Sequence, residues 1–383
     1  MKLFKHLEIL LKNTLSDSLR LIFAQSEWTP SPPYHNILFV RYGGIGDMIL
    51  SMPVLESARA RFPEARIDVL CDRKNMAPLL GSALADHIYT YEKQPLKILK
   101  LVRRLRKNKY DYIVNLVLYP SFTFGIITRL IGPRAGRAAG NQQRFSYFFN
   151  RNMALPYLQS THILQTHFKL ASDIAGNRLP QLLTPWVEYD GGIKARAENI
   201  YGELYRKFSQ NSHPLKIVAL NLSAGIERRE WPVEKYASFL SSALRENKFG
   251  IDGWAVITDI HRPERAGELV KMVDHPLVQQ LPVVTDFRVL MEFLRHLHLL
   301  ITPDTSLAHA ASAMGTPVLD MIIGENVFKW APYAVHHRMV ISADPLSLRE
   351  LPVGMVKAEF DLLMSELESN AAIENNLLNI SGN

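Results

Sequence analysis

The stretch 37–48, ILFVRYGGIGDM, constrains the fold more than any other part of the chain. The run of apolar residues at its start is typical of a strand buried on both faces, as in a parallel sheet. Three glycines follow, and they let the backbone turn sharply and approach a ligand closely. Ligands bind beyond the carboxyl ends of the strands in open α/β sheets. The sequence therefore predicts a strand, a tight loop and a helix, with Asp47 at the mouth of a pocket.

Apolar runs of strand length alternate with amphipathic segments along most of the chain. This alternation indicates parallel sheets with crossover helices, and so an α/β fold class. The chain of 383 residues is too long for one ordinary core, and two domains of roughly 150 to 200 residues are expected. The predicted strands are 37–40, 66–71, 88–90 and 112–117 in the first half, and 217–221, 255–258, 299–302 and 318–322 in the second.

The domain organisation follows from where these patterns start and stop. Residues 1–24 carry apolar residues at helical spacing with lysines and arginines among them, so this helix either lies on an anionic bilayer or packs against protein. The last predicted helix could cross back onto the first domain. The segments are an N-terminal amphipathic helix and linker (1–35), a first α/β domain (36–185), an interdomain connection (186–212), a second α/β domain (213–345), a C-terminal helix (346–370) and a frayed tail (371–383).

Composition excludes several classes of protein. The hydrophobic fraction of 47% and the charged fraction of 21% are those of a globular chain, not of a disordered one. A single cysteine, Cys71, excludes an internal disulfide framework and a cysteine-based zinc site. No apolar run reaches the roughly 18 residues of a membrane span, and no secretory signal is evident, so we expect a cytoplasmic protein, at most peripheral to the inner membrane face. The net charge of +7 favours anionic partners.

Two basic segments in the first half have competing interpretations. The predicted helix 95–109 is rich in lysine and arginine, but a core stripe at helical spacing makes its charges a solvated outer face. No nucleic-acid-binding motif accompanies it, and no nucleic-acid partner is predicted. Arg134 and Arg137 lie in a glycine-rich loop that either faces an anionic acceptor or is simply solvated. The predicted core stripe consists of Leu96, Leu99, Val102 and Leu105.

A strand-end loop in the second half, NLSAGIERREWP (221–232), is predicted to bind an anion. Small residues expose backbone N–H groups, and a guanidinium such as that of Arg228 or Arg229 binds phosphate oxygens in a fork. The alternative is a helix cap with solvated arginines.

Two further loops follow later strands. Asp304 and Thr305 are good N-cap residues at the start of a small-residue helix, whose free N–H groups could hold a diphosphate. Capping alone, with His309 as an ordinary helical histidine, is the structural alternative. The loop 324–333 is polar and aromatic, and it could close over a base or a sugar, or only pack.

Together these segments resemble glycosyltransferase family 9, the heptosyltransferases of lipopolysaccharide core assembly. The likeness lies in the order and spacing of three blocks: the Gly-Gly-Ile-Gly-Asp loop, the block from Asn221 to Trp231-Pro232, and the block from Asp304 to Gly-Thr-Pro at 315–317. It covers roughly residues 36–345, and the last block is specific in combination with the others.

The resemblance implies a GT-B architecture, with two Rossmann-like domains facing each other across a cleft, the acceptor on the first and a nucleotide sugar on the second. It implies inverting transfer without a metal or other cofactor. Asp47 would act as the general base and Arg229 would neutralise the departing diphosphate. The donor would be ADP-heptose, and the acceptor a lipopolysaccharide core or another anionic, lipid-linked glycan. Implied donor-binding residues are Ser223, Gly225, Arg228, Glu264, Asp304, Thr305, Ser306, Leu307, His309 and Gly324, and implied acceptor-binding residues are Gly44, Gly46, Arg134 and Arg137.

Two departures from the family pattern bear on the donor. Ser306 stands where the family usually has glycine, and Thr258-Asp259 replaces a common glycine pair, which adds a negative charge near the nucleotide. They suggest either a different nucleotide sugar or an alternative function, a noncatalytic binding or assembly module. A dinucleotide-dependent oxidoreductase is a weaker alternative, because the first loop lacks the Gly-x-Gly-x-x-Gly spacing.

Overall fold

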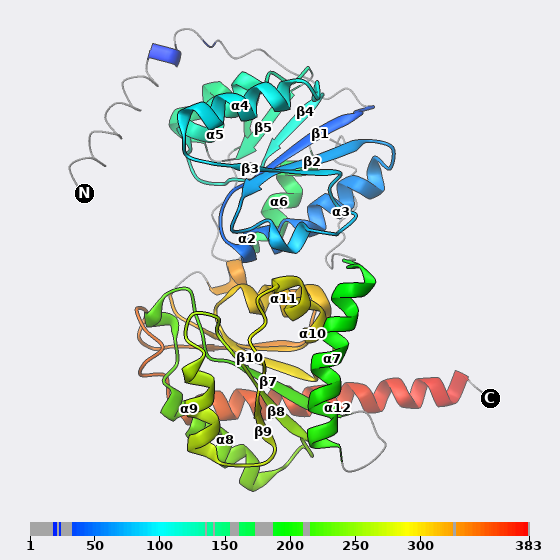
Figure 1. The fold of residues 1–383 in the computed structure, drawn as a ribbon, viewed down its shortest axis with the longest axis vertical. Helices are drawn as coiled ribbons and strands as arrows, with labels where there is room; N and C mark the ends of the chain where they lie inside the picture. Colours follow the sequence, from blue (N-terminus) through cyan, green and yellow to red (C-terminus); the bar gives the residue numbers. More distant parts are fainter. Residues whose placement is uncertain are drawn as a thin grey trace. The chain divides into compact units, whose positions relative to one another are not determined.

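A computed structural model describes residues 18–20, 23, 33–134, 136–140, 142–153, 161–172, 187–209, 215–324 and 327–381, with the backbone alone at 143 and 371–381. The chain divides into two compact units, Met1–Val187 and Glu188–Asn383. Each is an α/β unit built on a parallel six-stranded sheet (Figure 1). The expected fold class, α/β with two Rossmann-like domains, is confirmed.

The sheet of the first unit has the strand order β3-β2-β1-β4-β5-β6, and all of its pairs are parallel. From β1 the chain moves outward through β2 to β3, and it then returns to the other side of β1 with β4. The order therefore reverses between β1 and β4. The strands are β1 (Asn36–Arg41), β2 (Arg66–Asp72), β3 (His87–Tyr91), β4 (Tyr112–Asn115), β5 (Gly136–Gly140) and β6 (Arg151–Met153).

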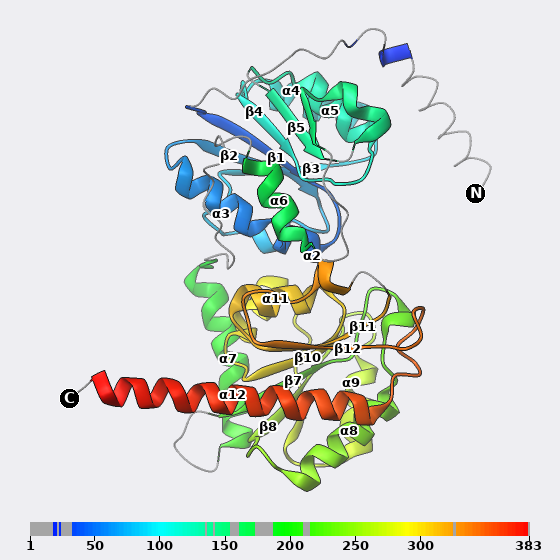
Figure 2. The same cartoon turned by 180° about the vertical axis from the view of Figure 1, so that it is seen from behind.

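Helices cover both faces of this sheet. Val102 and Leu105 of α4 and Phe124 of α5 pack on the strands in one cluster, while α3 and α6 lie together on the other face (Figures 1 and 2). The helices are α2 (Ile45–Ile49), α3 (Met52–Arg61), α4 (Pro95–Arg106), α5 (Phe122–Ile131) and α6 (Ile163–Ser172), with short 3₁₀ turns η1 (Ala77–Leu79) and η2 (Gln143–Phe148).

The core stripe predicted for α4 is half wrong. Val102 and Leu105 are buried, but Leu96 and Leu99 are 75% and 44% exposed. Ile98 and Leu101 pack against the core instead. The helix carries apolar residues on two sides, and the sheet can cover only one of them.

The second sheet has the strand order β12-β11-β10-β7-β8-β9, again all parallel. Its order reverses between β7 and β10. Residues of α8, α9 and α12 form the core on one face. The strands are β7 (Ile217–Asn221), β8 (Gly253–Ile257), β9 (Val278–Gln280), β10 (Leu299–Pro303), β11 (Val318–Ile322) and β12 (His337–Ile341). The helices are α7 (Gly191–Phe208), α8 (Val233–Glu246), α9 (Glu264–Val273), α10 (Phe287–Leu294), α11 (Ser306–Met314) and α12 (Val353–Ser381), with turns η4 (Glu227–Arg229) and η5 (Val327–Trp330).

The structure describes three of the predicted segments. The interdomain connection predicted at 186–212 contains helix α7, which packs on α10 of the second unit. For the C-terminal helix, which could cross back onto the first domain, the structure shows Val356, Phe360 and Leu363 in the core of the second unit. The expected frayed tail continues α12 as far as Ser381, because no glycine or proline interrupts it after Gly354.

The N-terminal segment 1–24 lies outside the described residues except at its end. There Phe23 contacts Phe148, with ring centroids 6.0 Å apart, and the Arg129 guanidinium lies 4.9 Å from the Phe23 ring centre. These contacts favour packing against protein for this end of the segment. Within the described part of the chain, no helix is both long and apolar enough to cross a bilayer.

Candidate active site

The Gly-Asp loop follows β1 at the point where the order of the first sheet reverses, which is where open α/β sheets bind ligands. Gly43 has a φ of +146°, and a Cβ added to it would lie 2.4 Å from Oδ2 of Asp47. Only glycine leaves room for the carboxylate at this place. The predicted role of the glycines, to place Asp47, is thus explained by a direct steric requirement at Gly43.

Two hydrogen bonds hold the Asp47 carboxylate at the start of α2. The backbone N–H of Gly44 donates to Oδ2 at 2.8 Å, and Nη2 of Arg41 donates to Oδ1 at 2.6 Å. Arg41 is itself buried, whereas the Asp47 side chain is 31% exposed. Each carboxylate oxygen can accept a second hydrogen bond. Asp47 is therefore a fixed carboxylate with accepting capacity toward solvent.

Aromatic side chains, which the sequence analysis missed, surround this loop. Tyr42 packs against Tyr91 and Phe124, with ring centroids 6.1 and 5.2 Å apart. Tyr119, in the loop after β4, is 48% exposed. Burial raises the pKa of Tyr119, and Arg41 and Asp47 both act on its hydroxyl through their charges. Tyr119 therefore lies within electrostatic range of Asp47 and offers an open aromatic ring.

The two arginines assigned to the acceptor do not join this site. The Arg134 side chain is 62% exposed. The residue precedes β5, and its backbone N–H donates to the carbonyl oxygen of Tyr110, which precedes β4. Arg134 therefore lies at the amino-terminal edge of the sheet, opposite Asp47. Arg137 is in β5 and buried, and its Nε donates to the Phe148 carbonyl oxygen at 2.8 Å. Burial lowers the pKa of Arg137 to about 10. The predicted glycine-rich loop is a strand start, and neither residue faces Asp47.

In the second unit, the reversal point lies between β7 and β10, and three polar side chains meet there. The Asn221 amide donates to Thr302 Oγ1 at 2.9 Å and to Thr305 Oγ1 at 3.3 Å. Thr305 caps α11 by accepting from the Leu307 N–H at 3.2 Å. The network fixes the start of α11, whose first backbone N–H groups have no partner within the helix and favour anions.

Arg229 and Asp304 lie beside this helix start. Nη1 of Arg229 is 3.0 Å from Oδ2 of Asp304, and the two side chains are 35% and 16% exposed. Among the described residues, Nε of Arg229 has no acceptor. Burial raises the pKa of Asp304, and Arg229 opposes that shift. Nε is itself buried, but the Arg229 side chain as a whole stays 35% exposed and can therefore still donate to an added anion.

Glu230 braces the loop that carries Arg229. The carboxylate pairs with Arg262 and with Arg265, and it accepts from the backbone N–H of Ala224 at 3.2 Å. Arg262 also lies 3.7 Å from Asp259. The negative charge that Asp259 adds to this region is therefore partly offset by Arg262.

The remaining predicted donor residues follow the carboxyl ends of β7, β8, β10 and β11, which meet at one edge of the parallel sheet. Ser223 donates to Asn221 at 3.0 Å, and Gly324 has a φ of +94°. His309 and Leu307 are buried in α11. The set at this edge is Ser223, Gly225, Arg228, Glu264, Asp304, Thr305, Ser306, Leu307, His309 and Gly324.

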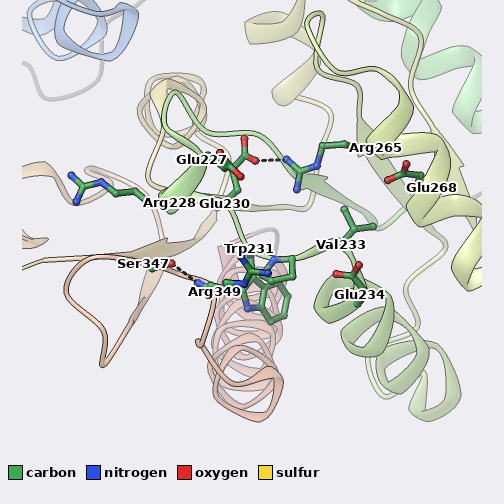
Figure 3. A pocket seen from close by; sticks show the side chains of 11 residues that line it. Glu227, Arg228, Glu230, Trp231, Val233, Glu234, Arg265, Glu268, Ser347 and Arg349 are labelled. Atoms are coloured by element: carbon green, nitrogen blue, oxygen red, sulfur yellow. Dashed lines mark hydrogen bonds and ion pairs between the residues drawn. The ribbon is translucent and has the colours of Figure 1, made fainter.

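A pocket of about 500 Å³ opens next to η4 (Figure 3). It lies between the start of α8, α9 and the 347–349 loop, and of the predicted donor residues it is lined by Arg228. Trp231 forms its floor, fully buried, and donates from Nε1 to the Leu351 carbonyl oxygen at 2.9 Å. The Trp-Pro pair thus anchors the loop. Within the described residues, no cluster of three or more His, Cys, Asp or Glu side chains is arranged to hold a metal ion.

Comparison with known proteins adds to this geometry. A relative, lipopolysaccharide heptosyltransferase 3 of Escherichia coli, is 22% identical over 302 residues, covering 76% of this chain and 84% of the relative. A solved glycosyltransferase family 9 protein from Veillonella parvula superposes with a TM-score of 0.71 at 16% identity, covering 87% of this chain and 98% of that one. The E. coli ADP-heptose LPS heptosyltransferase II gives a TM-score of 0.66 at 20% identity, with coverages of 87% and 99%.

The family is shown by a match that covers more than half of the chain. Residues 98–348 match the family described as glycosyltransferase family 9 (heptosyltransferase). This segment contains all six strands of the second sheet and the loops that follow β7, β8, β10 and β11. The chain therefore belongs to glycosyltransferase family 9 and is a glycosyltransferase.

Proposed function

We propose that the chain transfers a sugar, heptose from an ADP-linked donor in the simplest case, to a lipopolysaccharide core or a related lipid-linked glycan. Transfer proceeds with inversion at the anomeric carbon and without a metal ion. The single observation that carries the proposal is a pair of sites, one in each unit, at the switch point where the strand order of the sheet reverses. The first unit has a fixed carboxylate there, and the second has a cationic helix start. The names of the relatives supply the sugar and the acceptor class.

On the acceptor side, Asp47 is the general base. An acceptor hydroxyl oxygen attacks the anomeric carbon while Asp47 takes its proton, and the bond from that carbon to the diphosphate oxygen breaks. Arg41 and the Gly44 N–H keep the carboxylate in one orientation. A positioned base of this kind contributes roughly 10²- to 10⁴-fold to the rate.

On the donor side, Arg229 and the first N–H groups of α11 receive the charge of the leaving diphosphate. The Arg229 side chain is 35% exposed and can donate to the diphosphate, and the helix start adds the positive end of its dipole. Fixed charges of this kind stabilise a developing anion without reorganisation. They take the place that a divalent cation has in metal-dependent transferases.

Two variants test the assignment. Asp47→Asn should lower kcat by about 10²-fold or more while the Kd for ADP, measured by calorimetry, stays unchanged. Arg229→Ala should raise the Kd for ADP by roughly 10- to 100-fold, because a hydrogen bond to a charged group is worth about 1.5–3 kcal/mol.

Matched controls make the result specific. Asp86 also pairs with an arginine, Arg59, at 2.6 Å, so Asp86→Asn should leave transfer intact. Arg245 is exposed on α8, so Arg245→Ala is the control for Arg229→Ala and should leave the Kd for ADP unchanged. Near-parental transfer by Asp47→Asn would remove the base assignment. Absence of binding to every nucleoside diphosphate tested would favour a noncatalytic module instead.

A further inference from the structure

The outer face of α4 differs from an ordinary solvated helix face. Leu96 has the largest exposed fraction, 75%, among the exposed large hydrophobic residues of the described chain, and Leu99, one turn on, is 44% exposed. The inward side chains of α4 are Val102 and Leu105, with Ile98 and Leu101 packed beside them. Burial in the sheet therefore leaves these two leucines without cover.

Positive charge surrounds the two leucines. At helical spacing, Lys100, Arg103 and Lys107 share the outward face with Leu96. Glu92 is the one acidic residue in the segment 92–109, and it pairs with Lys97 at 2.5 Å. The basic residues of the segment are Lys93, Lys97, Lys100, Arg103, Arg104, Arg106, Lys107 and Lys109.

The apolar end of this face lies at a specific edge of the sheet. α4 starts at Pro95, directly after the carboxyl end of β3 at Tyr91. Because β1 and β3 are parallel members of one sheet, their carboxyl ends lie at the same edge, where the Asp47 loop follows β1. The exposed leucines thus lie at the Asp47 edge of the first unit, and the basic residues continue from them along α4.

We propose that the outer face of α4, defined by Leu96, Leu99, Lys100, Arg103 and Lys107, docks the protein on an anionic lipid bilayer. The leucines enter the boundary between headgroups and acyl chains, and the lysine and arginine stems extend to the lipid phosphates. Charge complementarity selects the anionic surface. The leucines distinguish a bilayer from a polyphosphate such as nucleic acid, which offers no apolar layer. The proposal stands on this surface alone and does not depend on which sugar is transferred.

Vesicle co-sedimentation of the full chain tests the proposal. Vesicles of phosphatidylcholine with phosphatidylglycerol should bind the protein, vesicles of phosphatidylcholine alone should bind it at least tenfold less, and salt should release it. The charge variant Lys100→Glu/Arg103→Glu and the apolar variant Leu96→Gln/Leu99→Gln should each lower binding at least tenfold. Transfer to a soluble acceptor fragment should be unchanged in both variants, which separates docking from the proposed chemistry.

Controls use equally exposed residues elsewhere. Leu346 and Leu362 are 64% and 49% exposed, so Leu346→Gln/Leu362→Gln matches the apolar variant. Lys271→Glu/Arg245→Glu, at exposed positions of α9 and α8, matches the charge variant. Retained binding in either α4 variant would overturn the proposal and direct attention to other segments such as 1–24. Binding of a DNA duplex that competes with vesicles and ignores the leucine changes would also overturn it.

Discussion

The Arg41 side chain binds both the side chain and the backbone of Asp47. Nη2 donates to Oδ1 of Asp47 at 2.6 Å and Nε donates to its carbonyl oxygen at 3.0 Å. Nη1 donates to the Leu116 carbonyl oxygen at 2.9 Å, in the loop after β4. One buried guanidinium therefore links the proposed base to both strands that flank the switch point.

This relationship makes Arg41 a positioning residue. We expect Arg41→Met to lower kcat by about 100-fold, because a displacement of about 1 Å in a reacting group has that effect. The Kd for ADP should not change, since the proposed donor site lies on the second unit. Arg41→Lys keeps the charge but cannot make the three contacts together, and should fall between the parent and Arg41→Met.

Arg59→Met is a matched control for this prediction. Arg59 also pairs with an aspartate at 2.6 Å and donates to a backbone carbonyl oxygen at 2.6 Å, but on α3. Both methionine variants should lose stability by roughly 1–3 kcal/mol, from polar groups left without partners. A kcat loss of equal size in both would show that the effect of Arg41 is merely structural.

Gly43 allows a second, steric test of the same carboxylate. In Gly43→Ala the new methyl group would lie 2.4 Å from Oδ2 of Asp47, so the carboxylate must move. We expect kcat to fall by at least about tenfold, measured in the same transfer assay. Gly132→Ala is the control: Gly132 also has a positive φ, +67°, but its Cβ would meet nothing within 4 Å. Both variants should lose about 1 kcal/mol of stability, and only Gly43→Ala should lose activity.

Tyr119 should act on the acceptor. Its ring is 48% exposed at the Asp47 edge, and an aromatic face suits the apolar side of a sugar ring. We expect Tyr119→Ala to raise the acceptor KM by roughly 3- to 10-fold, which corresponds to one aromatic contact, with the ADP Kd unchanged. Tyr119→Phe retains the ring and should remain near the parent. An unchanged KM in Tyr119→Ala would exclude the ring from the acceptor site.

The sequence predicted the elements whose residues have one dominant pattern. The run Ile37–Val40 could only be buried on both faces, and the strand-end loops followed from the parallel order. Strand β5 was missed because GRAAG contains no β-branched or aromatic residue, and it pairs only because β4 offers a free edge. Arg134 and Arg137 were therefore assigned to a loop facing the acceptor.

Helix α4 and the aromatic residues show a different limit. In α4, apolar residues occur on two faces, so helical spacing alone cannot predict which face is buried. Packing on the sheet covers Ile98 and leaves Leu96 exposed. Tyr42, Tyr91 and Tyr119 come from three separate strand ends. Only the sheet order brings them to one edge, so no local spacing could indicate their proximity.

The last prediction concerns Asp320, a buried aspartate whose carboxyl group interacts electrostatically with Asp304. Asp320 lies in β11, paired in register with Thr302 of β10. It is fully buried, and among the described residues neither carboxyl oxygen has a hydrogen-bond partner. Burial raises the pKa of Asp320 well above its ordinary value, Asp304 raises it further, and Arg229 opposes the shift.

The folded state thus keeps a proton on Asp320 that the unfolded chain loses above its pKa of about 3.9. Because the unfolded state then binds fewer protons, the free energy of unfolding falls as the pH rises from there toward the folded pKa. Asp320→Asn cannot titrate, so its unfolding free energy, measured by urea titration between about pH 5 and pH 8, should fall less steeply than that of the parent. Any change in the free energy of unfolding that the amide causes at every pH shifts the whole curve equally, so it does not affect the comparison of slopes. A parental slope in Asp320→Asn would mean that Asp320 is ionised in the folded protein.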